Sequence, residues 1–171
     1  MESVLDRVIK QNTENVNLLK TKDYNIFSVL QIQSKEVLIC RMIADLLNPR
    51  GQHGAGAEYL KIFLRDCLGM EKMDTKLADQ AIVTAEYAID DERRIDIVIE
   101  IGSYFLPIEV KIYAADQKSQ CFDYYQYAKR RDAQAKVYYL TLDGHRPGKD
   151  STSSGNRSVT EEDIVCLSFR E

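Results

Sequence analysis

Residues 94–111 constrain the fold of this chain more than any other stretch. They read Arg-Ile-Asp-Ile-Val-Ile-Glu-Ile-Gly-Ser-Tyr-Phe-Leu-Pro-Ile-Glu-Val-Lys, with apolar residues alternating on either side of Gly102-Ser103. This pattern is typical of two strands joined by a two-residue hairpin turn. With that turn, Ile101 pairs with Tyr104, and continuing the register places Asp96 directly opposite Glu109.

The expected pairing divides the hairpin into two faces, because successive side chains on a strand point to opposite sides of the sheet. The face expected to join the core carries Ile95, Ile97, Ile99, Ile101, Tyr104, Leu106, Ile108 and Val110. The opposite face carries Arg94, Asp96, Glu109 and Lys111 at the open end of the hairpin. Two acids and two cations are therefore expected to cluster there.

The opposed acids need a neutralising partner. Directly paired strand residues have Cβ atoms about 5 Å apart, and like charges at that distance repel. The two carboxylates then share a proton or a cation. Two interpretations stay open: Arg94 and Lys111 form a structural ion network, or a divalent metal binds. Ligands that are all oxygen favour Mg²⁺ or Mn²⁺ over zinc.

Apolar patterning elsewhere predicts helices before the hairpin and a helix and two strands after it. The expected elements are helices 34–47, 57–68 and 116–131 and strands 81–89, 94–101, 104–112, 136–142 and 164–169. Their order, ααβββαββ, predicts an α/β (α+β) fold with a mixed central sheet flanked by helices. Residues 1–20 are expected to form a polar helix, 25–32 a short apolar element, and 143–158 a mobile polar loop.

The length and composition fit one globular domain. With 171 residues and 44% hydrophobic side chains, the chain is long enough to bury a core. We expect a helical N-terminal part over about residues 1–70 and a catalytic core over about 80–171. Because the sequence ends directly after an expected strand, it is also expected to be a fragment of a longer protein.

The sequence carries neither a membrane-spanning run of about 18 apolar residues nor an apolar signal-peptide segment. The four cysteines are widely spaced and contain no C-x-x-C pair, so we expect free thiols rather than zinc ligands. Free thiols fit a reducing compartment. These features predict a cytoplasmic protein with no membrane partner.

Asp96, the hairpin, and then Glu109-Val110-Lys111 resemble the D…(D/E)-x-K signature of the PD-(D/E)XK nuclease superfamily. The motif's usual proline is missing, because isoleucines flank Asp96. Gln120 and Tyr124, on one helix face, resemble the Q-x-x-x-Y motif of the RecB-like branch. Residues 34–54 resemble the N-terminal region of a bacterial subfamily. The likeness runs from about residue 25 to the C-terminus and implies a restriction-endonuclease-like core.

The resemblance implies a Mg²⁺- or Mn²⁺-dependent nuclease. Asp96 and Glu109 would be the main metal ligands, with the backbone carbonyl of Val110 as a further one. Lys111 would orient the attacking water or stabilise developing negative charge. Gln120 and Tyr124 would face the same cleft.

The resemblance also implies one more residue at the metal site. In many relatives a glutamate from the first core helix reaches the metal, and Glu36 is the candidate here. Glu36 also falls in the first turn of an expected helix, where the helix dipole favours a carboxylate for structural reasons alone. RecB-like enzymes use an upstream histidine instead, and His53, in a glycine-rich turn, is kept as the substitute.

The charge distribution supports a nucleic-acid partner, although the net charge is −4. Residues 111–157 contain nine Lys or Arg and five Asp or Glu, so a basic segment follows the expected site. The candidate phosphate contacts are Lys118, Lys129, Arg130 and Arg131. DNA is the favoured substrate. The alternatives are a catalytically silent nucleic-acid-binding domain of the same fold and a metal hydrolase of small phosphoesters.

Overall fold

The computed structural model describes residues 29–32, 34–71 and 73–170. The chain divides into a unit of residues Met1–Gln33 and a compact unit of Ser34–Glu171. Of the first unit only residues 29–32, at a short turn, are described. The polar helix expected over residues 1–20 and most of the apolar element expected over 25–32 lie outside the described residues.

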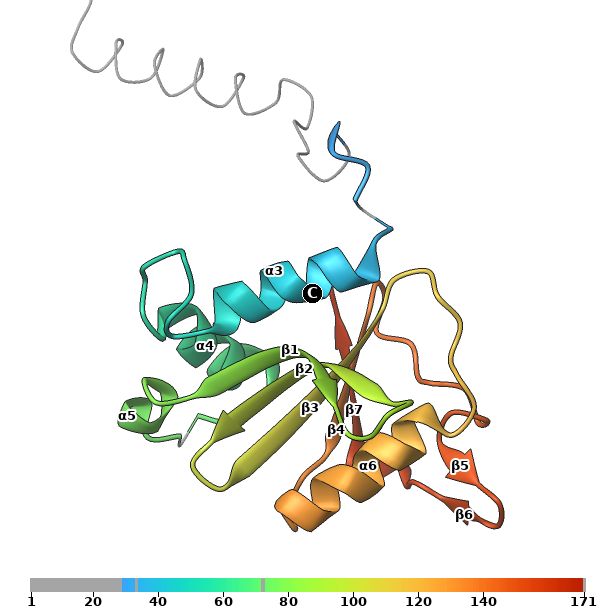
Figure 1. Cartoon of the computed structure of the whole chain (residues 1–171). Helices are drawn as coiled ribbons and strands as arrows, with labels where there is room; N and C mark the ends of the chain where they lie inside the picture. The colour runs from blue at the N-terminus through green and yellow to red at the C-terminus, as the bar shows by residue number, and fades with distance from the viewer. Residues whose placement is uncertain (1–28, 33, 72, 171) are drawn as a thin grey trace, which may run out of the picture. The chain divides into compact units, whose positions relative to one another are not determined.

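A mixed five-stranded sheet forms the centre of the second unit, in the order β1-β2-β3-β4-β7 (Figure 1). Its strands are β1 (Ile82–Ala88), β2 (Arg94–Ile101), β3 (Tyr104–Lys111), β4 (Val137–Thr141) and β7 (Ile164–Ser168). The first three strands pair antiparallel, whereas β3, β4 and β7 pair parallel. The predicted mixed sheet is confirmed.

Helices cover both faces of the sheet. Figure 1 shows α3 (Glu36–Leu47) and α4 (Glu58–Ile62) on one side and α6 (Gln120–Arg131) on the other. One core cluster contains residues of α3 and α4 with Ile97, Ile99 and Ile101. A second contains residues of α6 with Val98 and Phe105. Because both faces are covered, β3 and β4 are buried almost throughout, as expected for the parallel part of a sheet.

The predicted hairpin register is confirmed where β2 and β3 pair, from Ile101↔Tyr104 to Ile97↔Ile108. The prediction that all four isoleucines of β2 share one core is wrong, because Ile95 packs in the second cluster. The neighbouring strand β1 has a left-handed residue, Glu86, at φ +53° between its pairs to Ile97 and Ile95. This local distortion turns β2 just where Asp96 lies.

The helical region before the sheet differs in detail from the prediction. α3 begins at Glu36 rather than Ser34, and the side chain of its N-cap residue, Lys35, makes no capping hydrogen bond. The helix expected over 57–68 is the short α4 followed by a single π-helical turn (Phe63–Cys67). The sequence pattern did not predict α5 (Thr75–Ala78), which Asp74 caps by accepting a hydrogen bond from the Lys76 N–H. None of the helices in the described part of the chain is both long and apolar enough to cross a membrane.

The loop expected over 143–158 has more structure than predicted. It contains a small hairpin of β5 (Ser153–Ser154) and β6 (Arg157–Ser158). The Ser119 N–H donates to the Asp150 carbonyl at 2.7 Å, and the Phe122 N–H donates to the Ser151 carbonyl at 3.0 Å. These bonds satisfy N–H groups that a helix start leaves without partners. The loop therefore fixes the start of α6, which carries Gln120.

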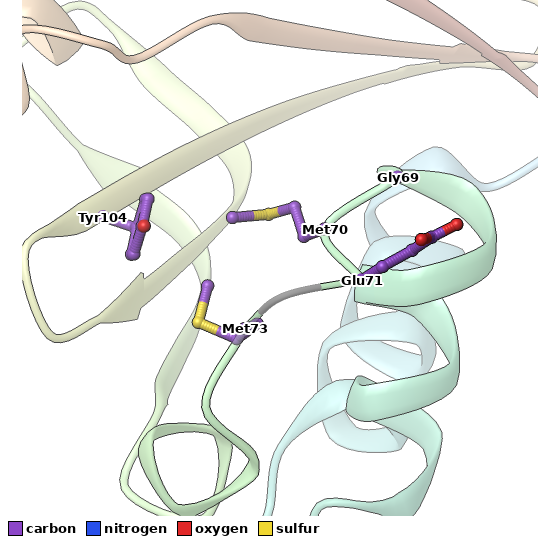
Figure 2. Close-up of a pocket in the computed structure, with 5 residues that line it drawn as sticks. All are labelled: Gly69, Met70, Glu71, Met73 and Tyr104. Atoms are coloured by element: carbon purple, nitrogen blue, oxygen red, sulfur yellow. The ribbon is translucent and has the colours of Figure 1, made fainter.

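A cavity of about 260 Å³ lies near the turn of the hairpin, where Tyr104 begins β3. Figure 2 shows Met70 and Met73 pointing into the space beside Tyr104, while Glu71 points away from it. Asp96 and Glu109 lie toward the opposite, open end of the hairpin. The cavity is therefore separate from the predicted acidic site.

Candidate active site

The pairing of β2 and β3 ends before it reaches the two predicted acids. Beyond Ile97↔Ile108, the Val110 N–H donates to Asp96 Oδ2 at 2.8 Å instead of to a backbone carbonyl. The Asp96 side chain thus replaces a ladder bond at the point where the strands separate. This contact brings the Asp96 carboxylate against the backbone beside Glu109, although the predicted pair of Asp96 and Glu109 lies beyond the last paired residues.

Glu109 is almost fully buried, with 1% of the residue exposed. Its Oε1 accepts hydrogen bonds from Lys111 Nζ at 2.5 Å and from Gln120 Nε2 at 2.7 Å. Its Oε2 is buried and has no partner among the described residues. Burial and the nearby Asp96 charge raise the pKa of Glu109 to about 8. A proton shared with Asp96, or a bound cation, would satisfy this pair.

Lys111 lies on β3, two residues after Glu109, and places a positive charge beside the two acids. Its side chain is 9% exposed and its ammonium contacts Glu109. Burial alone would lower the pKa of Lys111, but the charges of Glu109, Asp96 and Glu36 raise it overall. Lys111 therefore stays positively charged beside the acids at neutral pH.

Gln120 and Tyr124 lie beside Glu109, one helical turn apart on α6. Gln120 Nε2 donates to Tyr124 Oη at 3.1 Å, and Tyr124 Oη donates to the Arg94 carbonyl at 2.5 Å. The Gln117 N–H donates to Gln120 Oε1 at 3.3 Å, which orients the amide so that its nitrogen faces Glu109. Both side chains are buried, so their contacts position Glu109 and hold α6 to β2.

Glu36 lies at the start of α3, and its carboxylate accepts hydrogen bonds from the backbone that follows β3. Its Oε1 accepts hydrogen bonds from the N–H groups of Ile112 at 2.7 Å, Tyr113 at 3.0 Å and Ala114 at 3.0 Å. Although burial opposes the charged form, these three bonds and the Lys111 charge lower the pKa of Glu36. Glu36 thus brings a negative charge near Lys111 at neutral pH.

The structure does not bring His53 to these residues. Its Nδ1 accepts from the Ala55 N–H at 3.0 Å, and its Nε2 lies 3.2 Å from the Asn48 carbonyl. Both ring nitrogens are therefore engaged in the loop that follows α3. Glu36 begins α3 and this loop follows its last residue, Leu47, so the full length of the helix, about 17 Å, separates the two positions.

Two residues that hold the surroundings of the site together, Arg93 and Asp116, were not predicted from the sequence. Arg93 joins the β1–β2 turn to α6 through Asp123 at 3.1 Å and Gln117 at 2.9 Å. Asp116 accepts from Tyr139 Oη and from the Gly148 N–H, both at 2.7 Å. Their partners lie more than 20 residues away in the sequence, so no local pattern could indicate these contacts.

The oxygen-rich pair of Asp96 and Glu109 fits a hard divalent cation. In the part of the chain that the structure describes, no three His, Cys, Asp or Glu side chains gather closely enough to hold a metal ion. Two carboxylates with backbone carbonyl and water ligands match Mg²⁺, which usually keeps several waters. The partnerless Oε2 of Glu109 is the atom that such an ion would satisfy.

The raised pKa of Glu109 predicts how stability depends on pH. Between an unfolded pKa near 4.3 and the folded pKa of about 8, the folded state keeps a proton that the unfolded state has released. The free energy of unfolding of the metal-free protein should therefore fall across this range, by up to about 1.4 kcal/mol per pH unit. Thermal melting in EDTA from pH 5 to 9 measures this slope.

The matched variant for this measurement is Glu109→Gln, which should flatten the slope because it removes the titrating group. A slope as steep in the variant as in the wild type would contradict the assignment. Since a metal competes with the proton, Mg²⁺ should raise the melting temperature of the wild type more at pH 8 than at pH 6.

Comparison with known proteins adds to this geometry. A family model described as the PD-(D/E)XK nuclease superfamily matches residues 24–169. No match was found among curated proteins or among solved structures. The matched range covers most of the chain and contains every residue of the candidate site.

Proposed function

Because the chain belongs to the PD-(D/E)XK nuclease superfamily, we propose that it is a divalent-metal-dependent nuclease that hydrolyses phosphodiester bonds, with DNA as its favoured substrate. The observation that carries this proposal is Oε2 of Glu109, which is buried beside Asp96 and has no hydrogen-bond partner among the described residues. A structural ion network would pair both carboxylates with protein cations. Here Lys111 contacts only Oε1 of Glu109.

Asp96, Glu109 and the carbonyl of Val110 would hold Mg²⁺ or Mn²⁺. When bound, the ion lowers the pKa of a water and neutralises charge on the scissile phosphate. Asp96 also accepts a hydrogen bond from the Val110 N–H, so its carboxylate is already oriented toward β3. This preorganisation lowers the cost of assembling the site.

Lys111 would act on the substrate with its ammonium. The Glu109 contact holds Nζ at the edge of the acidic pair. A fixed positive charge there stabilises negative charge that develops on the phosphate oxygens, or orients the attacking water. Gln120 donates to the same Oε1 that Lys111 contacts, so it leaves Oε2 free for the ion. The Gln120–Tyr124 pair supports placement in the RecB-like branch.

We keep Glu36 in the site as an outer acid. Its Oε1 already accepts hydrogen bonds from three backbone N–H groups. Glu36 would therefore support the metal ion through its negative charge and through Oε2. His53 is left out, because both of its ring nitrogens are engaged in the loop after α3.

The basic segment supports a polymeric substrate, although two of the four candidate cations already have partners. Lys129 lies 3.8 Å from Asp163, and Arg131 lies 2.6 Å from Glu100. Lys118 precedes α6 and Arg130 lies in its last turn, and these two remain the candidate phosphate contacts. All four cysteines are free, which fits the reducing cytoplasm of a bacterium as the setting.

The test is incubation of the full chain with single- and double-stranded DNA and RNA in Mg²⁺, Mn²⁺ or EDTA. We expect cleavage of DNA with either metal and complete loss in EDTA that added Mg²⁺ reverses. Binding without cleavage in both metals would favour a catalytically silent domain. Hydrolysis of bis-(p-nitrophenyl) phosphate without cleavage of any polymer would favour a small-phosphoester hydrolase.

A further inference from the structure

Tyr113, an exposed aromatic residue, closely follows Lys111 of the candidate site in the chain. Tyr113 is 69% exposed, which is the largest value among the large hydrophobic residues that the structure describes. It stands two residues beyond Lys111 in the sequence. Two residues of chain span at most about 7 Å, so the backbone of Tyr113 lies close to that of Lys111.

The backbone that carries this ring is anchored. Glu36 Oε1 accepts hydrogen bonds from the N–H of Tyr113 and from those of both neighbours, Ile112 and Ala114. The charge of Glu36 strengthens these bonds relative to neutral ones. Tyr113 is therefore held in place at its backbone while its ring stays in solvent.

Other exposed tyrosines have partners that account for them. Tyr59 packs edge-on against His53, with ring centroids 5.0 Å apart. Tyr104 lines the cavity with Met70 and Met73. Within the residues that the structure describes, the ring of Tyr113 has no aromatic partner and no cation stacked on it.

We propose that Tyr113 stacks on an unpaired base of the substrate, next to the phosphate that Lys111 faces. This inference rests on the proposed nuclease function and narrows its substrate class. A base inside a closed duplex already stacks on both neighbours, so an aromatic platform requires a single-stranded nucleotide. The enzyme thus acts on single-stranded segments or on ends that open, with little sequence preference at that nucleotide, because every base offers a π-face.

Binding and cleavage by the full chain test this proposal, with Tyr113→Ala, Tyr113→Phe and Tyr113→Leu. Tyr104→Ala is the matched control, an exposed tyrosine at the far end of β3. Binding is measured in EDTA by fluorescence anisotropy with a single-stranded DNA and with a closed hairpin duplex. A single-stranded DNA containing 2-aminopurine reports stacking directly through quenching of its emission.

We expect Tyr113→Ala and Tyr113→Leu to weaken single-stranded binding by about 5- to 150-fold, the range for one aromatic–base stack. Tyr113→Phe and Tyr104→Ala should bind like the wild type. The 2-aminopurine quenching should disappear in Tyr113→Ala and persist in Tyr113→Phe. Because the Tyr113 ring is exposed, the melting temperatures of the three Tyr113 variants should match that of the wild type.

The outcomes separate this proposal from the proposed function. Metal-dependent cleavage by the wild type together with unchanged single-stranded binding by Tyr113→Ala overturns the stacking role and leaves the nuclease intact. An equal loss of affinity for the closed duplex also overturns it. A wild-type protein that neither binds nor cleaves any nucleic acid in Mg²⁺ or Mn²⁺ overturns both.

Discussion

Lys111→Ala and Asp96→Asn should each reduce nuclease cleavage by about a thousandfold or more and leave the fold intact. Removing one preorganised group that stabilises transition-state charge typically costs about 10²- to 10³-fold in rate, and losing a metal ligand removes the activated water as well. Cleavage of labelled DNA in Mg²⁺, followed over a thousandfold range of enzyme concentration, measures the loss.

The two variants should differ in stability. Asp96→Asn removes one of two close carboxylates, so its melting temperature in EDTA should equal or exceed that of the wild type. Lys111→Ala removes the cation that contacts buried Glu109, and should destabilise the protein. The control is Glu100→Gln, because Glu100 lies on β2 with Asp96 but pairs with Arg131. Undiminished cleavage by either active-site variant would rule out the mechanism.

The hairpin was predictable because its pattern is local and strict. A turn at Gly102-Ser103 fixes every later pair in the register, and alternation then assigns each side chain to a face. The same reasoning failed at Ile95, because it assumes that both strands run straight to their ends. The left-handed Glu86 in β1 and the end of pairing at Ile97↔Ile108 break that assumption.

The contacts of Glu36 and of the 143–158 loop could not be predicted from periodicity. Glu36 bonds to backbone groups 76 to 78 residues away, and a backbone N–H carries no signal in the sequence. The loop looked unstructured because it is polar and rich in glycine. Its backbone nevertheless caps α6 at Ser119 and Phe122, which becomes visible only when the fold brings them together.

The two roles of Glu36 predict different responses in two variants. Glu36→Gln keeps a carbonyl oxygen that can accept from the backbone after β3 but removes the charge. Glu36→Ala removes the acceptor as well, and leaves three N–H groups to water or to nothing. The alanine variant should therefore lose about 1–3 kcal/mol of unfolding free energy, while the glutamine variant should melt close to the wild type.

The Mg²⁺ concentration needed for half-maximal cleavage should instead depend on the negative charge of Glu36. If Glu36 supports the ion as an outer acid, both variants should need about 10- to 100-fold more Mg²⁺ for half-maximal cleavage, as is typical when an outer-shell partner is lost. Glu58→Gln is the matched control, because Glu58 is also a first-turn helix acid but pairs with Lys61. A glutamine variant with the Mg²⁺ response of the wild type would limit Glu36 to holding the backbone at Tyr113, because its charge would then be dispensable at the metal.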